Sequence, residues 1–303
     1  MFLALSLAHA ATFDEISILA MQDYPTTGGT SVSTEGDPCD NPVASDCSDY
    51  VTVGYQQVVR ELGTAIGNKP SLPAQTLGVN GFAFTLSNTT AFIRTGTLDG
   101  VNPSGWDLVA EDDGAPALIL IPQLQFRKGL PFSLEAGVNL GWIAVTQTAV
   151  VSGYGRWGLL EGWKQFPDVT LQFGYSGYVG NEELELGTFD ASVTIGYQLA
   201  FGRSAEMNSS IFSPFVGFGL QRFHAAPRVD LTDTALEGRI PEVSGWKSAD
   251  DPASEKYVFD PQFSPFTLGG GFRIQSGSFT FTASADYALK SIVTVRTGFG
   301  FVY

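Results

Sequence analysis

The chain has 303 residues, of which only 16% are charged, and it carries a formal net charge of -15 together with 35 Gly and 23 Phe. This balance is too acidic for a nucleic-acid binder and too apolar for a disordered chain. The longest apolar run, residues 115–121, ends at Pro122 and falls short of the roughly 20 apolar residues that a membrane helix needs. We therefore expect any membrane span of this chain to be made of strands.

The first ten residues predict a signal peptide. A short apolar stretch runs into Ala8, His9 and Ala10, a small-any-small pattern typical of cleavage after residue 10. The alternative interpretation is an ordinary buried N-terminal segment. In an exported chain, the closely spaced Cys39 and Cys47 predict a disulfide. The aspartates around them match no calcium-loop spacing, so we expect a solvated acidic loop and neither a metal nor a cofactor.

Residues 11–75 differ from the rest of the chain and form an N-terminal extension. Apolar residues at helical spacing predict one short amphipathic helix in it, ending before Pro70: Tyr55, Val58, Val59, Leu62 and Ile66. The extension either lies in the periplasm or plugs a barrel. The apolar stripe of the helix argues against contact with a polar lumen wall.

Residues 76–303 alternate with the period of β-strands. One face carries Phe, Leu, Val and Tyr, whereas the other carries Gly, Ser, Thr, Asn and Gln with few charges. A soluble β-sandwich would place Lys, Glu and Arg on its wet face, so the pattern favours an all-β, transmembrane, antiparallel up-and-down β-barrel. We expect about ten strands, with eight and twelve left open: residues 76–95, 116–127, 131–146, 151–163, 167–180, 186–201, 211–225, 263–275, 278–289 and 291–303. The long connections, 96–115 and 226–262, are expected on the external side.

The chain ends on RTGFGFVY, with aromatic residues in alternate positions of the last predicted strand. A polar residue, Gly and two hydrophobic residues stand at the spacing of the C-terminal insertion signal of Gram-negative outer-membrane β-barrel proteins: Arg296, Gly298, Phe301 and Tyr303. In architecture, residues 76–303 resemble this class. The resemblance implies an outer-membrane location reached through the periplasm, insertion by the barrel-assembly machinery, and contact with outer-membrane lipid and lipopolysaccharide. We expect a monomer.

Polar residues on the second face are candidates for lining the lumen. They are Glu135, Asn139, Arg156, Gln172, Asp190, Gln198, Arg273, Asp286 and Arg296. Mixed charges in a narrow interior either pair into a network that fills it or line a selective channel, and the residues alone do not separate these two interpretations.

Acidic residues gather in two of the predicted external loops. The set is Asp99, Asp107, Glu111, Asp112, Asp113, Glu182, Glu183 and Glu185. Such a rim would raise the local concentration of cations and repel anions. A cation-bridged surface beside anionic lipid explains the same residues.

These patterns predict a narrow channel for small cations or neutral solutes. One alternative is a closed barrel that acts in adhesion or envelope structure through its external loops. Another is a transporter of hydrophobic solutes, because Asp40, Asn41 and Pro42 resemble the plug of long-chain fatty-acid channels. An outer-membrane hydrolase would need His224 as a base with a residue such as Ser213. His224 shares a face with apolar residues, so we predict no enzyme.

Overall fold

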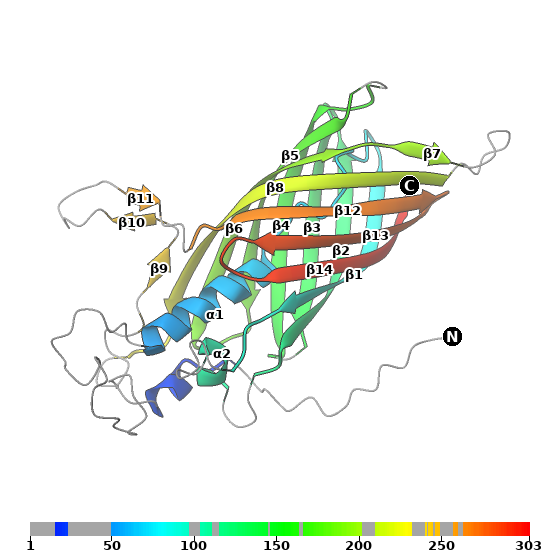
Figure 1. The fold of residues 1–303 in the computed structure, drawn as a ribbon. Helices are drawn as coiled ribbons and strands as arrows, with labels where there is room; N and C mark the ends of the chain where they lie inside the picture. Colours follow the sequence, from blue (N-terminus) through cyan, green and yellow to red (C-terminus); the bar gives the residue numbers. More distant parts are fainter. Residues whose placement is uncertain are drawn as a thin grey trace, which may run out of the picture.

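The computed structural model describes residues 16–23, 50–96, 104–110, 115–144, 146–163, 166–201, 210–231, 240, 242–244, 246–248, 257–259 and 263–303. In this part of the chain, ten long antiparallel strands close into a barrel (Figure 1). They are β1 (Phe82–Phe92), β2 (Leu118–Leu130), β3 (Leu134–Ile143), β4 (Thr148–Leu160), β5 (Asp168–Val179), β6 (Leu184–Gly196), β8 (Ser210–Pro227), β12 (Phe266–Ser276), β13 (Phe279–Ala288) and β14 (Val293–Val302). The predicted ten-strand barrel is confirmed.

The barrel closes because β1 pairs with both β2 and β14, while β12 pairs with both β8 and β13. The residue that starts β1, Phe82, exchanges backbone hydrogen bonds with Tyr303 at the end of the chain. Side chains alternate between the two faces of each strand, as in β4, where Ser152 and Arg156 are buried inside and Val151 and Trp157 are exposed outside. Each of these ten strands therefore has a hydrogen-bonded neighbour on both sides, as a lipid-embedded sheet requires.

The two ends of the barrel differ in their connections. At one end the turns are mostly short, and we call this the short-turn end; β7 (Leu199–Phe201) lies there and pairs with the start of β8. At the other, the long-loop end, the β1–β2 connection holds α2 (Gly105–Leu108). The β8–β12 connection there holds β9 (Val243–Ser244), β10 (Trp246–Ser248) and β11 (Tyr257–Phe259), of which β10 and β11 pair with each other.

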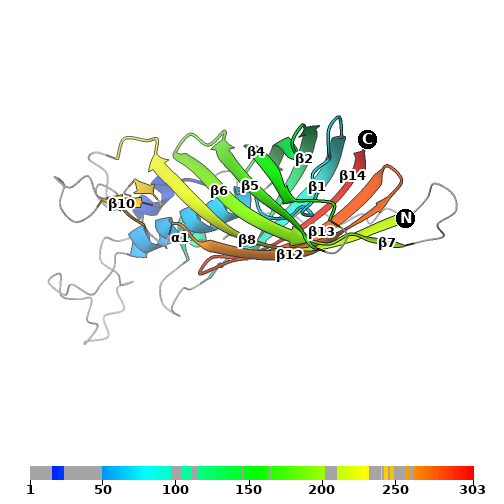
Figure 2. The same cartoon turned by 90° about the horizontal axis from the view of Figure 1, so that it is seen from above.

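The N-terminal part contributes η1 (Leu19–Asp23) and α1 (Tyr50–Ile66), and α1 lies at the long-loop end (Figures 1 and 2). Helix α1 packs against α2 and contacts β1, β5, β6 and β8. All five residues of the predicted apolar stripe are buried. No helix in the described ranges has the length and hydropathy needed to cross a membrane.

Residues that follow α1 run through the barrel instead of beginning the first strand. Every residue from 61 to 75 is buried, and β1 starts at Phe82, not at the predicted residue 76. The contacts described below place residues 67–77, which we call the lumen segment, inside the barrel. The chain thus enters the lumen at the long-loop end and leaves it at the short-turn end.

Candidate functional site: the barrel lumen

Asn68 anchors the lumen segment to the wall just after α1. Its side-chain amide donates to Ser176 at 3.2 Å and to Asp190 at 3.1 Å, and its carbonyl oxygen accepts from Asn139 at 3.0 Å and Ser152 at 3.1 Å. These four partners come from β3, β4, β5 and β6, so one side chain ties the segment to four neighbouring strands. The Asn68 side chain thus uses both its N–H groups and its carbonyl oxygen, and its partners are a carboxylate, an amide and two hydroxyls.

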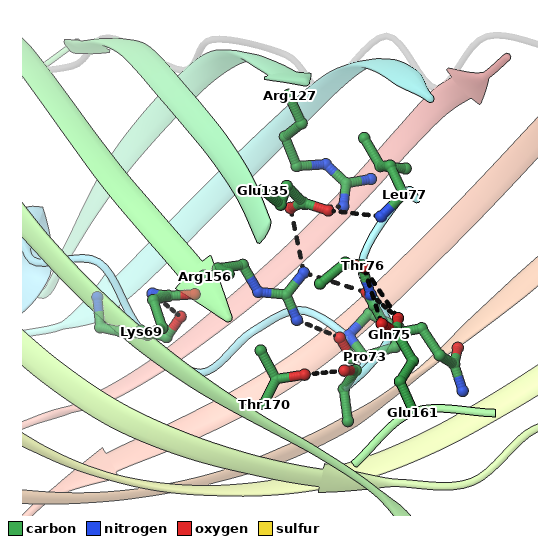
Figure 3. Close-up of polar contacts among 12 residues, drawn as sticks. Lys69, Pro73, Gln75, Thr76, Leu77, Arg127, Glu135, Arg156, Glu161 and Thr170 are labelled. Carbon is green, nitrogen blue, oxygen red and sulfur yellow. Dashed lines mark hydrogen bonds and ion pairs between the residues drawn. The ribbon is translucent and has the colours of Figure 1, made fainter. Parts of the chain in front are cut away.

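A buried ion cluster binds the part of the segment that is nearer to the short-turn end (Figure 3). Oε1 of Glu135 lies 3.1 Å from the guanidinium of Arg156 and 3.5 Å from that of Arg127, and all three side chains are almost fully buried. The other carboxylate oxygen of Glu135 accepts from the backbone N–H of Leu77 at 3.0 Å. Arg156 also donates to the backbone carbonyls of Pro73 and Gln75. The cluster therefore binds wall strands to the backbone of the segment through charge-assisted hydrogen bonds.

The segment leaves the lumen beside the β4–β5 turn. Thr76 donates through its hydroxyl to Glu161 at 3.0 Å (Figure 3). The side chain of Gln75 donates to Asp168. The hydroxyl of Thr170 donates to the carbonyl of residue 74. Backbone carbonyls that no strand partner can reach are thus satisfied by side chains of the wall.

Glycines of the wall make room for the segment. A Cβ atom at Gly217 would lie 2.3 Å from the ring of Pro70, and one at Gly174 would lie 2.6 Å from the amide nitrogen of Asn68. Real Cβ atoms do not approach other heavy atoms so closely, so a larger residue at either position would displace the segment. The lumen wall is shaped to the backbone that fills it.

The described part of the lumen is filled. A cavity of about 10 Å³ lies beside Asn68 and Lys69, and a second of about 20 Å³ lies beside Ser71. Each has room for one small occupant, such as a water molecule or a monatomic ion. The lumen segment thus occupies the space between these strands and leaves small cavities beside it.

At the long-loop end, Glu61 of α1 joins the helix to the β1–β2 connection. Its fully buried carboxylate accepts from Nε of Arg94 at 2.8 Å, the backbone N–H of Arg94 at 3.1 Å, and the indole of Trp106 at 2.9 Å. Gln57, one turn earlier, donates to Glu61 at 3.2 Å and accepts from the backbone N–H of Gly105 at 3.0 Å. A carboxylate with this many donors is satisfied even without water.

The segment around η1 lies at the same end. Glu183 accepts from the hydroxyl of Ser17 at 3.2 Å and from the backbone N–H of Leu19 at 2.9 Å, and Asn181 donates to the carbonyl of Ile16 at 2.9 Å. Glu183 and Asn181 both belong to the β5–β6 connection. Together, η1, α1 and α2 form a cap at the long-loop end, over one continuous apolar core that includes wall residues Leu184, Leu186 and Phe223.

Two ionisable groups of the cap have displaced pKa values. Burial, with a smaller contribution from Glu242, raises the pKa of Tyr55. Burial, followed by the nearby Arg94, lowers the pKa of Arg60. In both cases burial in the cap removes water from the side chain and so destabilises its charged form.

The structure places eight of the nine proposed lumen residues on the inner face. Glu135, Asn139, Arg156, Gln172, Asp190, Arg273 and Asp286 are buried there, and Arg296 donates to Ser71 at 2.9 Å and to Gln123. The prediction that Gln198 lines the lumen is wrong. This residue is exposed in the connection after β6, because that strand ends at Gly196. Sequence reasoning missed Asn68 and Glu61, which lie outside any strand pattern. It also missed Arg127, although this residue continues the alternation of Gln123 and Gln125 on the inner face of β2.

The proposed acidic rim is only partly within the described residues. Asp107 accepts from the Ser104 hydroxyl at 2.6 Å and so helps to form the start of α2. Glu183 binds the η1 segment, whereas Glu182 and Glu185 are exposed and Glu185 lies 3.7 Å from Arg228. Asp99, Glu111, Asp112 and Asp113 lie outside the described residues, as do Cys39, Cys47 and the predicted signal peptide, residues 1–10.

The proposed hydrolase pair is not assembled. His224 is half-exposed on the outer face, with Nδ1 3.8 Å from Oε1 of Glu242, while Ser213 is buried on the inner face of the same strand. Within the described ranges, no group of three His, Cys, Asp or Glu side chains could hold a metal ion.

The outer surface of the barrel decides its class. Large apolar side chains cover it on every part of the wall, for example Leu140, Phe173, Phe218 and Phe299, each about half exposed or more. A continuous apolar belt around a closed sheet is suited to lipid and not to water. The chain is a transmembrane β-barrel. The resemblance to outer-membrane β-barrel proteins, inferred from the C-terminal pattern, is confirmed at the level of architecture by the closed ten-strand barrel.

No protein-family model matches this transmembrane β-barrel. No curated protein matches it either. Among similar solved structures, the N-terminal β-barrel domain of Pseudomonas aeruginosa OprF is 12% identical, covers 75% of this chain and 99% of its own, and has a TM-score of 0.26. KdgM porin is 6% identical, with coverage of 72% and 98% and a TM-score of 0.30. The attachment invasion locus protein Ail of Yersinia pestis is 10% identical, with coverage of 74% and 99% and a TM-score of 0.24.

Proposed function

We propose that this protein is a closed barrel of the Gram-negative outer membrane that acts in adhesion or envelope structure through its long loops. The observation that carries the proposal is the lumen segment, which fills the barrel from one end to the other. The continuous apolar cap at the long-loop end supports the same conclusion.

Opening the barrel would require breaking several contacts at once. The segment is held by the four bonds of Asn68, by the charge-assisted bonds of Arg156, and by the carboxylates of Glu135 and Glu161. A neutral hydrogen bond contributes about 0.5–1.5 kcal/mol net, and one to a charged group about 1.5–3 kcal/mol. Because these contacts lie on different strands, the segment cannot leave by a small local movement.

In the orientation that we propose, the cap lies at the cell surface. Barrels of this kind have short periplasmic turns and longer external loops, so the long-loop end faces outward. The cap then holds the β1–β2, β5–β6 and β8–β12 connections on a common apolar core. A rigid base under long external loops suits binding to other surfaces better than passage of solutes.

The experiment that tests the proposal has two arms. Purified, refolded protein is inserted into a planar bilayer in a potassium chloride gradient, and we expect no conductance steps. Cells that produce the protein are compared with cells that lack it for adherence to surfaces and for resistance to detergent, and we expect at least one of these to decrease without it. Discrete steps from the intact protein would contradict the closed barrel, and unchanged adherence and resistance would contradict the surface role.

Gated passage of small cations or neutral solutes is a second candidate, favoured by the polar wall of the lumen. Gln123, Asn139, Ser152, Thr170 and Gln172 would line a hydrated path if the segment were displaced. A variant that loosens the segment should then conduct, and its reversal potential would report ion preference. Transport of hydrophobic solutes finds no favourable surface in this polar wall, and the separated His224 and Ser213 favour a non-enzymatic role.

A further inference from the structure

The larger of the two lumen cavities has an unusual lining. It measures about 20 Å³ and lies between the lumen segment and the wall formed by β1, β2, β13 and β14. Its polar lining consists of Ser71, Thr85, Ser87, Gln125, Arg127, Thr282 and Arg296. Two guanidinium groups and several hydroxyls thus face one small space that no carboxylate lines.

Several donors at this cavity have no partner in the part of the chain that the structure describes. Ser87 Oγ, Arg127 Nε and Arg296 Nε are all buried, and none has a hydrogen-bond partner among the described residues. Ser87 is 7% exposed and Arg127 is 3% exposed. Buried N–H and O–H groups need an acceptor, so the cavity calls for an occupant that accepts hydrogen bonds.

The charges around the cavity do not balance. Glu135 is shared between Arg127 and Arg156, which leaves one positive charge in excess. Arg273 adds a second, because it is buried on the inner face with no ion pair in the described part of the chain, and its strand partner Thr282 lines the cavity.

The other nearby charges do not remove this excess. Asp286 lies two residues along β13 from Ser284, the residue paired with Arg296, so it can offset Arg296. Asp190 accepts from Asn68 on the opposite wall, and Glu161 and Asp168 bind Thr76 and Gln75 at the exit of the segment. Water could accept the free hydrogen bonds, but it would leave the positive charge uncompensated.

We propose that this cavity binds a small inorganic anion, which is chloride under ordinary salt conditions. The size of the cavity favours a monatomic anion. Its volume of about 20 Å³ is only slightly larger than the roughly 10–15 Å³ that one water molecule needs. Arg127, Arg296 and the Ser87 hydroxyl donate to the anion. The Ser71 hydroxyl, which already accepts from Arg296, ties the anion site to the lumen segment.

The direct test is diffraction from crystals of the intact protein grown with sodium bromide in place of chloride. The expected result is an anomalous peak in the cavity beside Arg127 and Arg296. In solution, the midpoint of heat-induced unfolding is measured in potassium chloride, potassium bromide and potassium gluconate at equal ionic strength. We expect a higher midpoint in both halides than in gluconate, with a difference that grows with the logarithm of the halide concentration and reaches roughly 5 °C at about 100 times the dissociation constant.

Three variants refine the test. Ser87→Ala removes one donor and should weaken the halide dependence, whereas Arg273→Gln lowers the positive excess and should raise the midpoint in gluconate while shrinking the halide effect. The matched control is Lys128→Gln, which removes an exposed charge next to Arg127 on β2 and should leave the halide effect unchanged. An empty cavity in the bromide data, or equal midpoints in bromide and gluconate, overturns the proposal.

Discussion

Replacing Glu135 by glutamine removes the only carboxylate that contacts Arg127 and Arg156 among the described residues, with almost no change in shape. Glutamine keeps an oxygen that can accept from the N–H of Leu77, so the loss is mainly electrostatic. Removing one partner of a buried ion pair costs about 3–5 kcal/mol, since the remaining charge is left uncompensated. We expect a loss of about 3 kcal/mol, at the lower end, because the amide oxygen still accepts one hydrogen bond.

This loss is measured as a lower midpoint of the heat-induced mobility shift on electrophoresis and as a lower midpoint in urea. For a chain of this size, about 3 kcal/mol corresponds to roughly 5 °C. The matched control is Glu185→Gln at the long-loop end, where the carboxylate is about half exposed and lies 3.7 Å from Arg228. An exposed pair of this kind contributes about 0–1 kcal/mol.

A double variant tests the reason for the loss. Adding Arg127→Gln to Glu135→Gln removes one of the two stranded positive charges, so the double variant should lose less than the sum of the single variants. All measurements are made at one fixed chloride concentration, because Arg127 also lines the small cavity. Equal losses for Glu135→Gln and Glu185→Gln, or strictly additive losses in the double variant, would refute the view that the buried cluster fastens the lumen segment.

Three further predictions concern the fit of the N-terminal part inside the wall. Gly217→Val should displace the lumen segment and produce conductance steps in a planar bilayer, whereas Gly155→Val, where a Cβ would meet no atom within 4 Å, should stay silent. Phe223→Ala should lower the free energy of unfolding by about 3–5 kcal/mol, since this ring is fully buried under α1, while the lipid-facing Phe218→Ala should cost clearly less. Burial raises the pKa of Tyr55, so the stability of the cap is fully present below the unfolded tyrosine pKa of about 10 and is lost as the pH rises above it. Tyr55→Phe should remove this alkaline loss, which hydrogen exchange of α1 would show.

The strands and the polarity of their two faces could be predicted because a strand has period two and each face meets a different medium. The same argument fails where a strand stops: the alternation continues to Gln198, but β6 ends at Gly196 and the short β7 follows. Periodicity reports which face a residue would take in a strand. It does not report where pairing ends.

The position of α1 could not be predicted, because its apolar stripe argued against a polar lumen wall. The wall is in fact apolar at the long-loop end, where Ile119, Ile121 and Phe223 face the cap. A signal was present in β2: its first four residues, Leu118 to Ile121, are apolar on both faces, and polar inner residues begin only at Gln123. The lumen segment is neither helix nor strand, and its contacts are spread over several strands of the wall, so no periodicity marks it in the sequence.

The path of the chain constrains the order in which the barrel closes. Helix α1 and the η1 segment lie at one end of the lumen, and β1 begins at the other, so residues 67–77 cross a space that the finished wall encloses. A folded cap could not be drawn through a filled lumen after closure. The β1–β14 seam, which joins Phe82 to Tyr303, is the pairing of greatest separation in the sequence and the last that the lumen segment permits. We therefore expect the wall to close around a segment that is already in place, so that substitutions at the glycines and arginines that contact it would slow barrel assembly as well as lower stability.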